Sequence, residues 1–427
     1  PMIKRVFIKS GLLFASLSLC AGVSHSADVN KLERCSTYTL NKTLSEWLVA
    51  NVTQHPTVLA AKAAVEASEF QQLAAAKALY NPELALATES VDEVTTTSLG
   101  ISQTIDWGDR RGANIKFASA QLRGKQSQLS LSQQQLSLSL LTALSKQHTS
   151  QALIALATQR SELMQRFVNL ARQRFSHGDL TRVEVDLAKL SYAQARFSQT
   201  SAQADFMRAQ QQLIALTGVA LDDWPLMPTN YPEPVAAGAD KEAWVQRLAT
   251  MQLALATIES AQALIKQRQA QAVVQPTLAL HAGKEESDHI VGLTLSLPLP
   301  LRNDFSAEVG AANAVLIQAK REAHAQFREL SSRYEISLGS YRLSRDAWLF
   351  WQQFAADSLA EHIRLLERLW QAGELSSSDY VIQLGQALQT KASAIQQRGK
   401  LWLDWAQWQH ASGHIEQCLL KDIEGAK

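Results

Sequence analysis

The chain has 427 residues, and its 41 lysines and arginines nearly balance its 40 aspartates and glutamates, which leaves a formal charge of +1. This balance excludes the basic surface that a nucleic-acid-binding protein needs. Only 19% of the residues are charged. Alanine, serine and glutamine are abundant, and this mixture favours thin helical walls with a wetted face over a thick apolar core.

Residues 1–26 have the pattern of a secretory signal peptide. Basic residues at positions 4, 5 and 9 precede an apolar run over 11–23, and the small residues Ser24 and Ser26 follow. We expect cleavage after Ser26, which would change the formal charge from +1 to −2. The pattern predicts export from the cytoplasm.

Two cysteines lie near opposite ends of the expected mature chain. If Cys20 leaves with the signal peptide, Cys35 and Cys418 remain. Exported proteins meet an oxidising compartment, so these two cysteines are a candidate disulfide. The alternative is a pair of unrelated buried thiols.

The first predicted elements are a helix and a strand hairpin. An alanine-rich helical pattern over 44–79 stops at Asn81-Pro82. Two stretches of alternating apolar residues follow, separated by a polar turn, and they predict a strand hairpin over 82–107.

A long helix follows the hairpin. The run over 109–177 contains no proline, and its apolar residues recur every seven positions, which is typical of a coiled coil. At 1.5 Å per residue it would be about 100 Å long. A tip at 178–181 leads into a return helix that starts at Arg182. We assign these elements to a first repeat over 27–217.

The rest of the chain repeats this order. A linker over 218–240 contains four prolines and cannot continue a helix. A second repeat over 241–412 and a tail over 413–427 follow. The second repeat is predicted to contain a helix over 243–272, a strand hairpin over 276–300, a long helix over 304–372, a tip over 373–376 and a return helix. The tips align as 174–180 over 369–375, so the chain is a duplicated unit.

The four strands have the length that crosses a bilayer obliquely. Four strands cannot close into a barrel, and an open sheet edge in lipid leaves backbone groups unpaired. Several copies would therefore pool their strands, and a cyclic trimer would have twelve. The alternating pattern also fits an ordinary sheet that lies on a helix.

The order of elements and several short segments resemble a known family. The segments are Leu-Tyr-Asn-Pro-Glu-Leu at 79–84, Ile-Asp-Trp-Gly-Asp-Arg-Arg at 105–111, Gln-Pro-Thr-Leu at 275–278, Leu-Pro-Leu-Pro-Leu at 297–301 and the two glycine tips. The chain resembles the TolC-like outer membrane factor family, including its cation-efflux (Czc-type) members. The similarity covers nearly the whole expected mature chain.

This resemblance implies a mainly α fold with β strands. Duplicated coiled-coil hairpins would form a periplasmic α-barrel, and four strands per chain would contribute to a trimeric twelve-stranded β-barrel in the lipid of the outer membrane. It also implies an exit duct that docks on a periplasmic adaptor, which contacts an inner-membrane transporter, here expected to be of the RND type. It implies no catalysis and no cofactor.

Acidic residues follow both tips and are candidates for a gate. The sixth residue after each tip glycine is acidic, Glu184 in one repeat and Asp379 in the other, and Asp186 lies nearby. Asp379 matches an acidic gate residue of the family. Leu375 and Ile382 replace a basic and an acidic residue of the family pattern. The alternative is that the three acids are solvated carboxylates stabilised by helix N-termini.

The tips themselves are candidates for adaptor docking, because a glycine, an acid and a leucine recur in both. These residues are Gly178, Asp179, Leu180, Gly373, Glu374 and Leu375. His410, His414 and Cys418 recur every four residues, but Gly413 interrupts their helix, and we predict no metal site.

The sequence therefore predicts an outer-membrane exit duct of a tripartite efflux system, with heavy-metal cations as the expected cargo. The alternatives are a drug-efflux or type I secretion duct and, from another class, a soluble periplasmic coiled-coil scaffold.

Overall fold

The computed structural model describes residues 42–91, 94–220, 223–234 and 241–415. The predicted signal peptide and the candidate disulfide between Cys35 and Cys418 lie outside the described residues. The described residues are mainly helical with one four-stranded sheet, which confirms the expected fold class.

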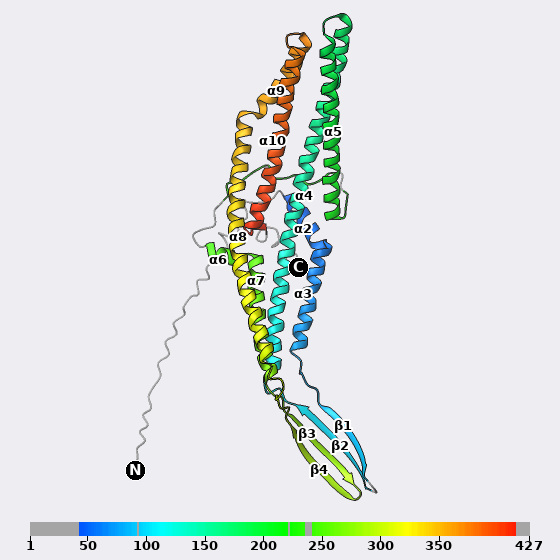
Figure 1. The fold of residues 1–427 in the computed structure, drawn as a ribbon, viewed down its shortest axis with the longest axis vertical. Coiled ribbons are helices and arrows are strands. Elements are labelled where there is room, and N and C mark those ends of the chain that lie inside the picture. Colours follow the sequence, from blue (N-terminus) through cyan, green and yellow to red (C-terminus); the bar gives the residue numbers. More distant parts are fainter. Residues whose placement is uncertain (1–41, 92–93, 221–222, 235–240, 416–427) are drawn as a thin grey trace, which may run out of the picture. The chain divides into compact units, whose positions relative to one another are not determined.

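The elements recur in the same order in the two halves of the chain (Figure 1). The first half contains α2 (Lys42–Gln54), α3 (Pro56–Ala75), β1 (Glu83–Val91), β2 (Val94–Thr104), α4 (Arg110–His177) and α5 (Arg182–Thr217). The second half contains α6 (Lys241–Gln246), α7 (Ala249–Ala272), β3 (Thr277–Glu285), β4 (Asp288–Ser296), α8 (Ser306–Phe354), α9 (Ala356–Ala372) and α10 (Ser377–Ala411).

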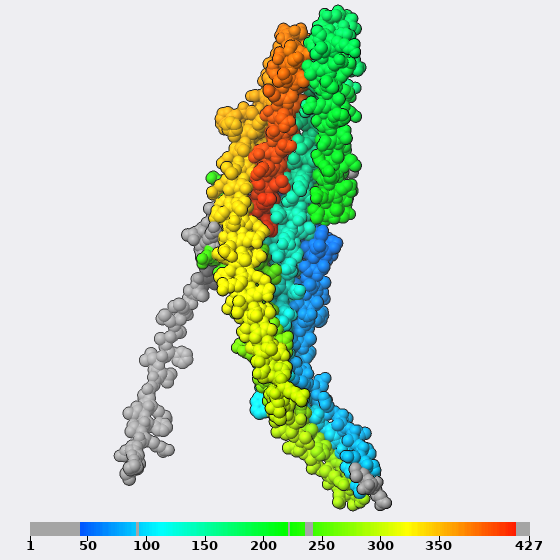
Figure 2. Space-filling model, viewed as in Figure 1, coloured from blue at the N-terminus to red at the C-terminus, as the bar shows by residue number. Residues whose placement is uncertain are grey.

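The helices form a wall, four helices wide, that leads away from the sheet. Next to the sheet the order of contacts is α3, α4, α7, α8, and toward the tips it is α5, α4, α10 and then α8 with α9. Figure 2 shows α10 filling the space between α8 and α4. Helices α3 and α5 therefore form one edge of the wall, and α8 and α9 form the other.

Both predicted short helices are divided. Pro56 is the first residue of α3, and the side chain of His55 accepts a hydrogen bond from the backbone N–H of Thr57, so a new helix starts there. In the second half α6 ends at Gln246, and α7 starts at Ala249.

The prediction of one continuous helix over 304–372 is wrong. Helix α8 ends at Phe354, Ala355 has a non-helical backbone (φ −132°, ψ −21°), and α9 begins at the next residue. As in the first long helix, the sequence has a row of every seventh residue here, and its members Tyr334 and Tyr341 are buried. In α9 the buried residues are Ile363, Leu366 and Trp370, and the first and last of these lie one position beyond His362 and Leu369, where the row of every seventh residue would continue. The break thus shifts the row of buried residues by one position, and the apolar side of α9 faces the neighbouring helices.

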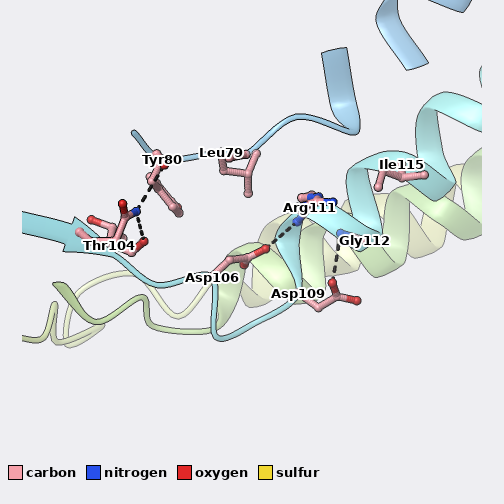
Figure 3. Close-up of a pocket in the computed structure, with 10 residues that line it drawn as sticks. Leu79, Tyr80, Thr104, Asp106, Asp109, Arg111, Gly112 and Ile115 are labelled. Atoms are coloured by element: carbon pink, nitrogen blue, oxygen red, sulfur yellow. Dashed lines mark hydrogen bonds between the residues drawn. The ribbon is translucent and has the colours of Figure 1, made fainter. Parts of the chain in front are cut away.

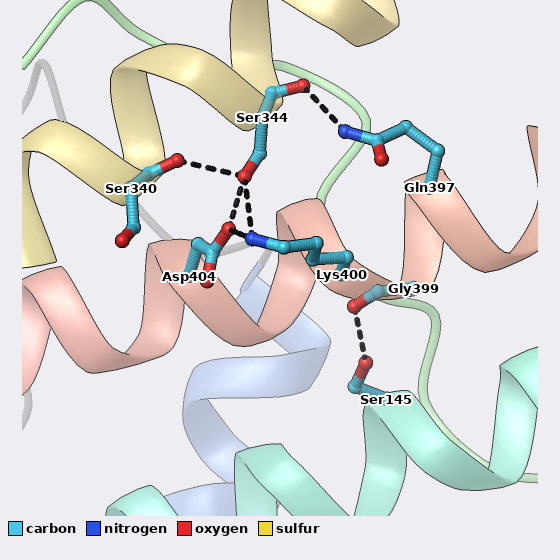
Figure 4. Close-up of polar contacts among 7 residues, drawn as sticks. All are labelled: Ser145, Ser340, Ser344, Gln397, Gly399, Lys400 and Asp404. Carbon is cyan, nitrogen blue, oxygen red and sulfur yellow. Dashed lines mark hydrogen bonds and ion pairs between the residues drawn. The ribbon is translucent and has the colours of Figure 1, made fainter.

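Polar contacts join α10 to both of its neighbours (Figure 4). Asp404 of α10 is only 7% exposed, and its carboxylate accepts hydrogen bonds from Lys400 and from Ser344 of α8. On the α4 side, Ser145 Oγ donates to the carbonyl of Gly399 at 3.1 Å. A Cβ at position 399 would collide with the side chain of Thr149, so glycine allows α10 to approach α4.

The described part of the proline-rich linker, residues 223–234, lies across the helices as an ordered strap. Four side chains donate to its carbonyl groups, which accept at 2.8 to 3.0 Å. The pairs are His148 of α4 with Pro225, Trp402 of α10 with Pro228, Arg345 of α8 with Tyr231, and Tyr341 of α8 with Pro232. The strap therefore ties α4, α10 and α8 together.

Candidate functional site

The sheet presents one continuous apolar face. Its four strands run antiparallel in the order β1-β2-β3-β4 and contain nine, eleven, nine and nine residues. The register aligns Leu84, Ile101, Leu280 and Leu293 in one row across all four strands. Leu84 is 74% exposed and Leu293 is 70% exposed. An exposed apolar face of this extent on strands of this length is suited to lipid.

The opposite face of the sheet is small and polar. One row holds Glu89, Thr96, Glu285 and Asp288, which places three carboxylates beside the hairpin turns. The next rows contain mainly alanine, glycine and serine. Alternation of an apolar and a polar face is the pattern of a transmembrane barrel strand with a wet interior.

Strands β1 and β4 each pair on one side only within the described residues. Their outer backbone groups would be unpaired in a bilayer, where no water can satisfy them. The sheet is therefore one segment of a larger closed structure if it lies in a membrane.

The motif at 105–111 joins the sheet to the wall (Figure 3). Asp106 accepts hydrogen bonds from the backbone N–H groups of Arg110 and Arg111 at 2.8 and 2.9 Å, and Asp109 accepts one from that of Gly112 at 3.1 Å. These bonds satisfy free N–H groups in the first turn of α4. The side chains of Asp106 and Arg111 also line a shallow pocket of about 430 Å³ beside Tyr80.

Arg110 holds the end of α7 against the start of α4. Its guanidinium donates to the carbonyls of Ala270, Gln271 and Val273 at 3.2, 2.7 and 2.9 Å. These carbonyls belong to the last turn of α7 and the residue that ends it, where helical partners are missing. The arginine thus connects the two repeats at the base of the sheet.

Both candidate docking tips have the same backbone. Gly178 and Gly373 adopt left-handed conformations (φ 87° and 81°), and the N–H groups of Asp179 and Glu374 donate to carbonyls five residues earlier at 2.9 and 3.0 Å. Both glycines and both acids are exposed. Leu180 and Leu375 are half-buried and pack on the core between the two hairpins.

The candidate gate acid Glu184 forms a capping box with Thr181, and Asp379 exchanges hydrogen bonds with the side chain of the helix-capping Ser376. Thr181 donates its backbone N–H to Glu184 at 2.9 Å, and Ser376 accepts a hydrogen bond from the backbone N–H of Asp379 at 3.1 Å while donating its hydroxyl to the carboxylate at 2.7 Å. The hydrogen bonds from Thr181 lower the pKa of Glu184. The shared position of the acids is therefore the third residue of each return helix.

Asp186 has different partners from the other two acids. Its carboxylate lies 2.8 Å from Lys189 Nζ and 3.9 Å from Arg182 Nε on the surface of α5. The hydrogen bond from Lys189 and its charge lower the pKa of Asp186. The structure thus pairs Asp186 within its own helix.

An aromatic cluster joins the two hairpins near their tips. Phe167 of α4 lies 4.7 Å from Trp370 of α9 and 5.4 Å from Tyr380 of α10, measured between ring centroids. Arg174 lies over the Trp370 ring at 5.3 Å and donates to the carbonyl of Gln371 at 2.8 Å. Sequence reasoning missed this cluster, because its members come from segments about two hundred residues apart.

The described residues show neither a metal-ligating cluster nor a membrane-spanning helix. No group of three or more histidine, cysteine, aspartate or glutamate side chains there could hold a metal ion. Cys418, the third residue of the spacing noted above, lies outside them. Among these same residues, no helix is both long enough and apolar enough to cross a bilayer.

Solved structures with this architecture are membrane channels. CusC matches with a TM-score of 0.71 at 13% identity, over 87% of this chain and 92% of that one. The CmeC outer membrane channel of Campylobacter jejuni matches with a TM-score of 0.73 at 11% identity, over 90% and 89%. The MtrE outer membrane channel of Neisseria gonorrhoeae matches with a TM-score of 0.67 at 13% identity, over 87% and 88%. The fold is therefore that of the outer-membrane channels with a helical tunnel.

A family model matches the first part of the chain. Residues 48–219 match the model of the outer membrane efflux protein family. No curated protein matches the chain. The resemblance to outer membrane efflux proteins that the sequence indicated is thus confirmed.

Proposed function

We propose that the chain is the outer-membrane subunit of a tripartite efflux system, with its sheet in the lipid of the outer membrane and its helical wall in the periplasm. The observation that carries this proposal is the exposed apolar face on four strands that continue directly into a long helical wall. The family match and the fold of the matched channels support it.

Assembly as a homotrimer accounts for the open edges. Apolar residues recur every seven positions on the exposed surfaces of α5 and α8, and they are between 64% and 78% exposed. They are Val183, Leu190 and Phe197 on α5, and Ile336, Leu343 and Phe350 on α8. These two stripes lie on opposite edges of the wall, so a contact between them is head-to-tail, which is the type of interface from which cyclic rings are built. Three copies would supply twelve strands.

The partners proposed are a periplasmic adaptor and an inner-membrane transporter of the RND type. The exposed tip residues Gly178, Asp179, Gly373 and Glu374, with the half-buried Leu180 and Leu375, are the proposed docking surface. A photocrosslinker at Asp179 or Glu374 should form an adduct with a co-expressed adaptor, and one at the exposed Lys116, near the sheet, should not. Equal adducts from all three positions would contradict tip docking.

Glu184, Asp186 and Asp379 remain the proposed gate residues. Heavy-metal cations remain the proposed cargo, on the resemblance to cation-efflux members. The row of three carboxylates on the polar face of the sheet supports this, because rings of acids favour cations. Deletion of the gene should lower the tolerated concentration of a heavy-metal salt, and drug sensitivity without metal sensitivity would contradict the cargo.

Membrane location is the first test of the whole proposal. The mature protein should fractionate with the outer membrane and should migrate differently on gels before and after heating, because closed barrels resist unheated detergent. Recovery in the periplasmic fraction as a monomer would overturn the proposal.

A further inference from the structure

One histidine stands alone on the polar face of the sheet. The register places Ala85, Gly100, His281 and Gly292 in one row across β1, β2, β3 and β4. In this row, only His281 has a side chain larger than a methyl group. Among the described strand residues of this face, it is also the only one that can carry a positive charge.

The two residues that pair with His281 on the neighbouring strands are glycines, which leave room for its side chain. The imidazole ring lies over the backbone of Gly292, where a Cβ would overlap Nε2 and Cε1. On the other side, a Cβ at Gly100 would lie 3.4 Å from the Cβ of His281. The ring is half-buried against the sheet, so its position is set by β4 as well as by its own strand.

The charged groups that face His281 are acids at some distance. On its own strand Glu285 lies four residues away, about 13 Å along the strand, and Asp288 of β4 pairs with Glu285. The residues of β2 on this face carry no charge. Glu83 and Glu89 of β1 are about 10 Å or more away across the sheet. All four exceed the screening length of about 8 Å at physiological salt. Lys284 and His289 lie on the opposite, apolar face.

We propose that His281 sets how the charge selectivity of the pore depends on pH. The inference rests on the proposed function, which makes the polar face of the sheet the wall of a water-filled pore. At neutral pH the acids of this face favour cations. Acidification protonates imidazole groups, so it gives each copy a positive charge in an otherwise uncharged row. That ring of charge opposes cations, because rings of charged side chains determine which ions a pore passes.

The test is the reversal potential of purified trimers in a planar bilayer under a potassium chloride gradient, at pH 7.5 and 5.5. We expect the cation-to-anion permeability ratio of the unmodified protein to fall about twofold on acidification. His281→Gln should lose this fall, while His281→Lys should show the low ratio at both pH values. The control His289→Gln, on the apolar face, should behave like the unmodified protein.

The outcomes separate this inference from the proposed function. A full fall in His281→Gln, or a ratio in His281→Lys equal to that of the unmodified protein at pH 7.5, would overturn the role of His281. Both results presuppose that channels form. If no variant and no unmodified protein forms channels, the proposed function itself fails.

Discussion

Glu184 shows how one side chain can have a structural role and a proposed gating role. It satisfies the backbone N–H of Thr181 in a capping box, and its pKa is lowered by those hydrogen bonds. The box was readable in the sequence as Thr181-x-x-Glu184, since this spacing marks a helix start. The two roles make different predictions for two variants.

Glu184→Gln keeps a side chain that can form the box but removes the charge. If Glu184 contributes to the gate, this variant should change single-channel conductance or cation selectivity in planar bilayers. Thr181→Ala should instead leave the charge and cost about 1 kcal/mol of helix stability. A conductance change in Thr181→Ala alone would assign Glu184 to the cap and not to the gate.

The gate role of Asp379 and Asp186 can be tested in the same way, although their hydrogen-bond partners differ. Asp379 is bonded to Ser376, as Glu184 is to Thr181. Asp186 is paired with Lys189, so its negative charge is partly compensated on the helix surface. We therefore expect Asp186→Asn to affect conductance less than Glu184→Gln does.

His410 provides a prediction about pH and stability. Burial is the main cause that lowers the pKa of His410, and the charge of Arg333 adds to it. Its Nε2 atom has no hydrogen-bond partner in the described residues. The unfolded chain therefore binds a proton at a pH at which the folded chain does not.

Above the ordinary pKa range of histidine, neither the folded nor the unfolded chain binds a proton at His410, and the protein keeps its full stability. This stability decreases as the pH falls through that range toward the lowered pKa of the folded state. The melting temperature of the assembled protein should thus fall between pH 7.5 and 5.5. His410→Gln should show a smaller fall. An equal fall in both proteins would contradict the assignment.

The elements show where the sequence was sufficient and where it was not. Strands β2, β3 and β4 follow the alternation of apolar and polar residues, and Asn81-Pro82 and Pro276 precede the hairpins as expected. The glycine tips were also predictable, because a left-handed residue after a helix favours glycine. Local propensity and pattern suffice for such features.

The break between α8 and α9 could not be predicted in this way. Ala355 favours helix, and no proline or glycine lies beside it. The break follows from the packing of Ile363 and Trp370 onto the other hairpin, one residue out of phase with Tyr341. Local sequence does not show which residues of a helix will face another helix that is distant in the chain.

The strap and the aromatic cluster were missed for a similar reason. The prolines of 223–234 correctly excluded helix, but they did not show that Trp402 and Arg345 donate to the strap carbonyls. Phe167 and Tyr380 are ordinary apolar positions until the two hairpins are placed together. Their contacts depend on tertiary structure.

At the scale of the whole molecule, the two apolar stripes make the assembly testable. Leu190→Asp on α5 or Leu343→Asp on α8 would bury a charge in the proposed contact between copies. Each should abolish the trimer on unheated gels and by light scattering in detergent. Gln203→Asp, which adds the same charge to an exposed position on another face of α5, should leave the trimer intact.

A result in which only the α5 variant loses the trimer would contradict the head-to-tail contact, because that geometry uses both stripes in every interface. Loss of the trimer in Gln203→Asp as well would show that an added charge anywhere on α5 is sufficient to disrupt the trimer.

The outer edges of β1 and β4, which have no strand partner in the part of the chain that the structure describes, also bear on how the protein assembles. A single copy that reached lipid alone would carry two rows of unsatisfied peptide groups, and in water the same rows could recruit foreign strands and aggregate. Barrel closure and subunit association are therefore expected to be one event and not two successive ones. The yield should then depend steeply on how many copies are synthesised at once, and surplus copies should be degraded before they insert.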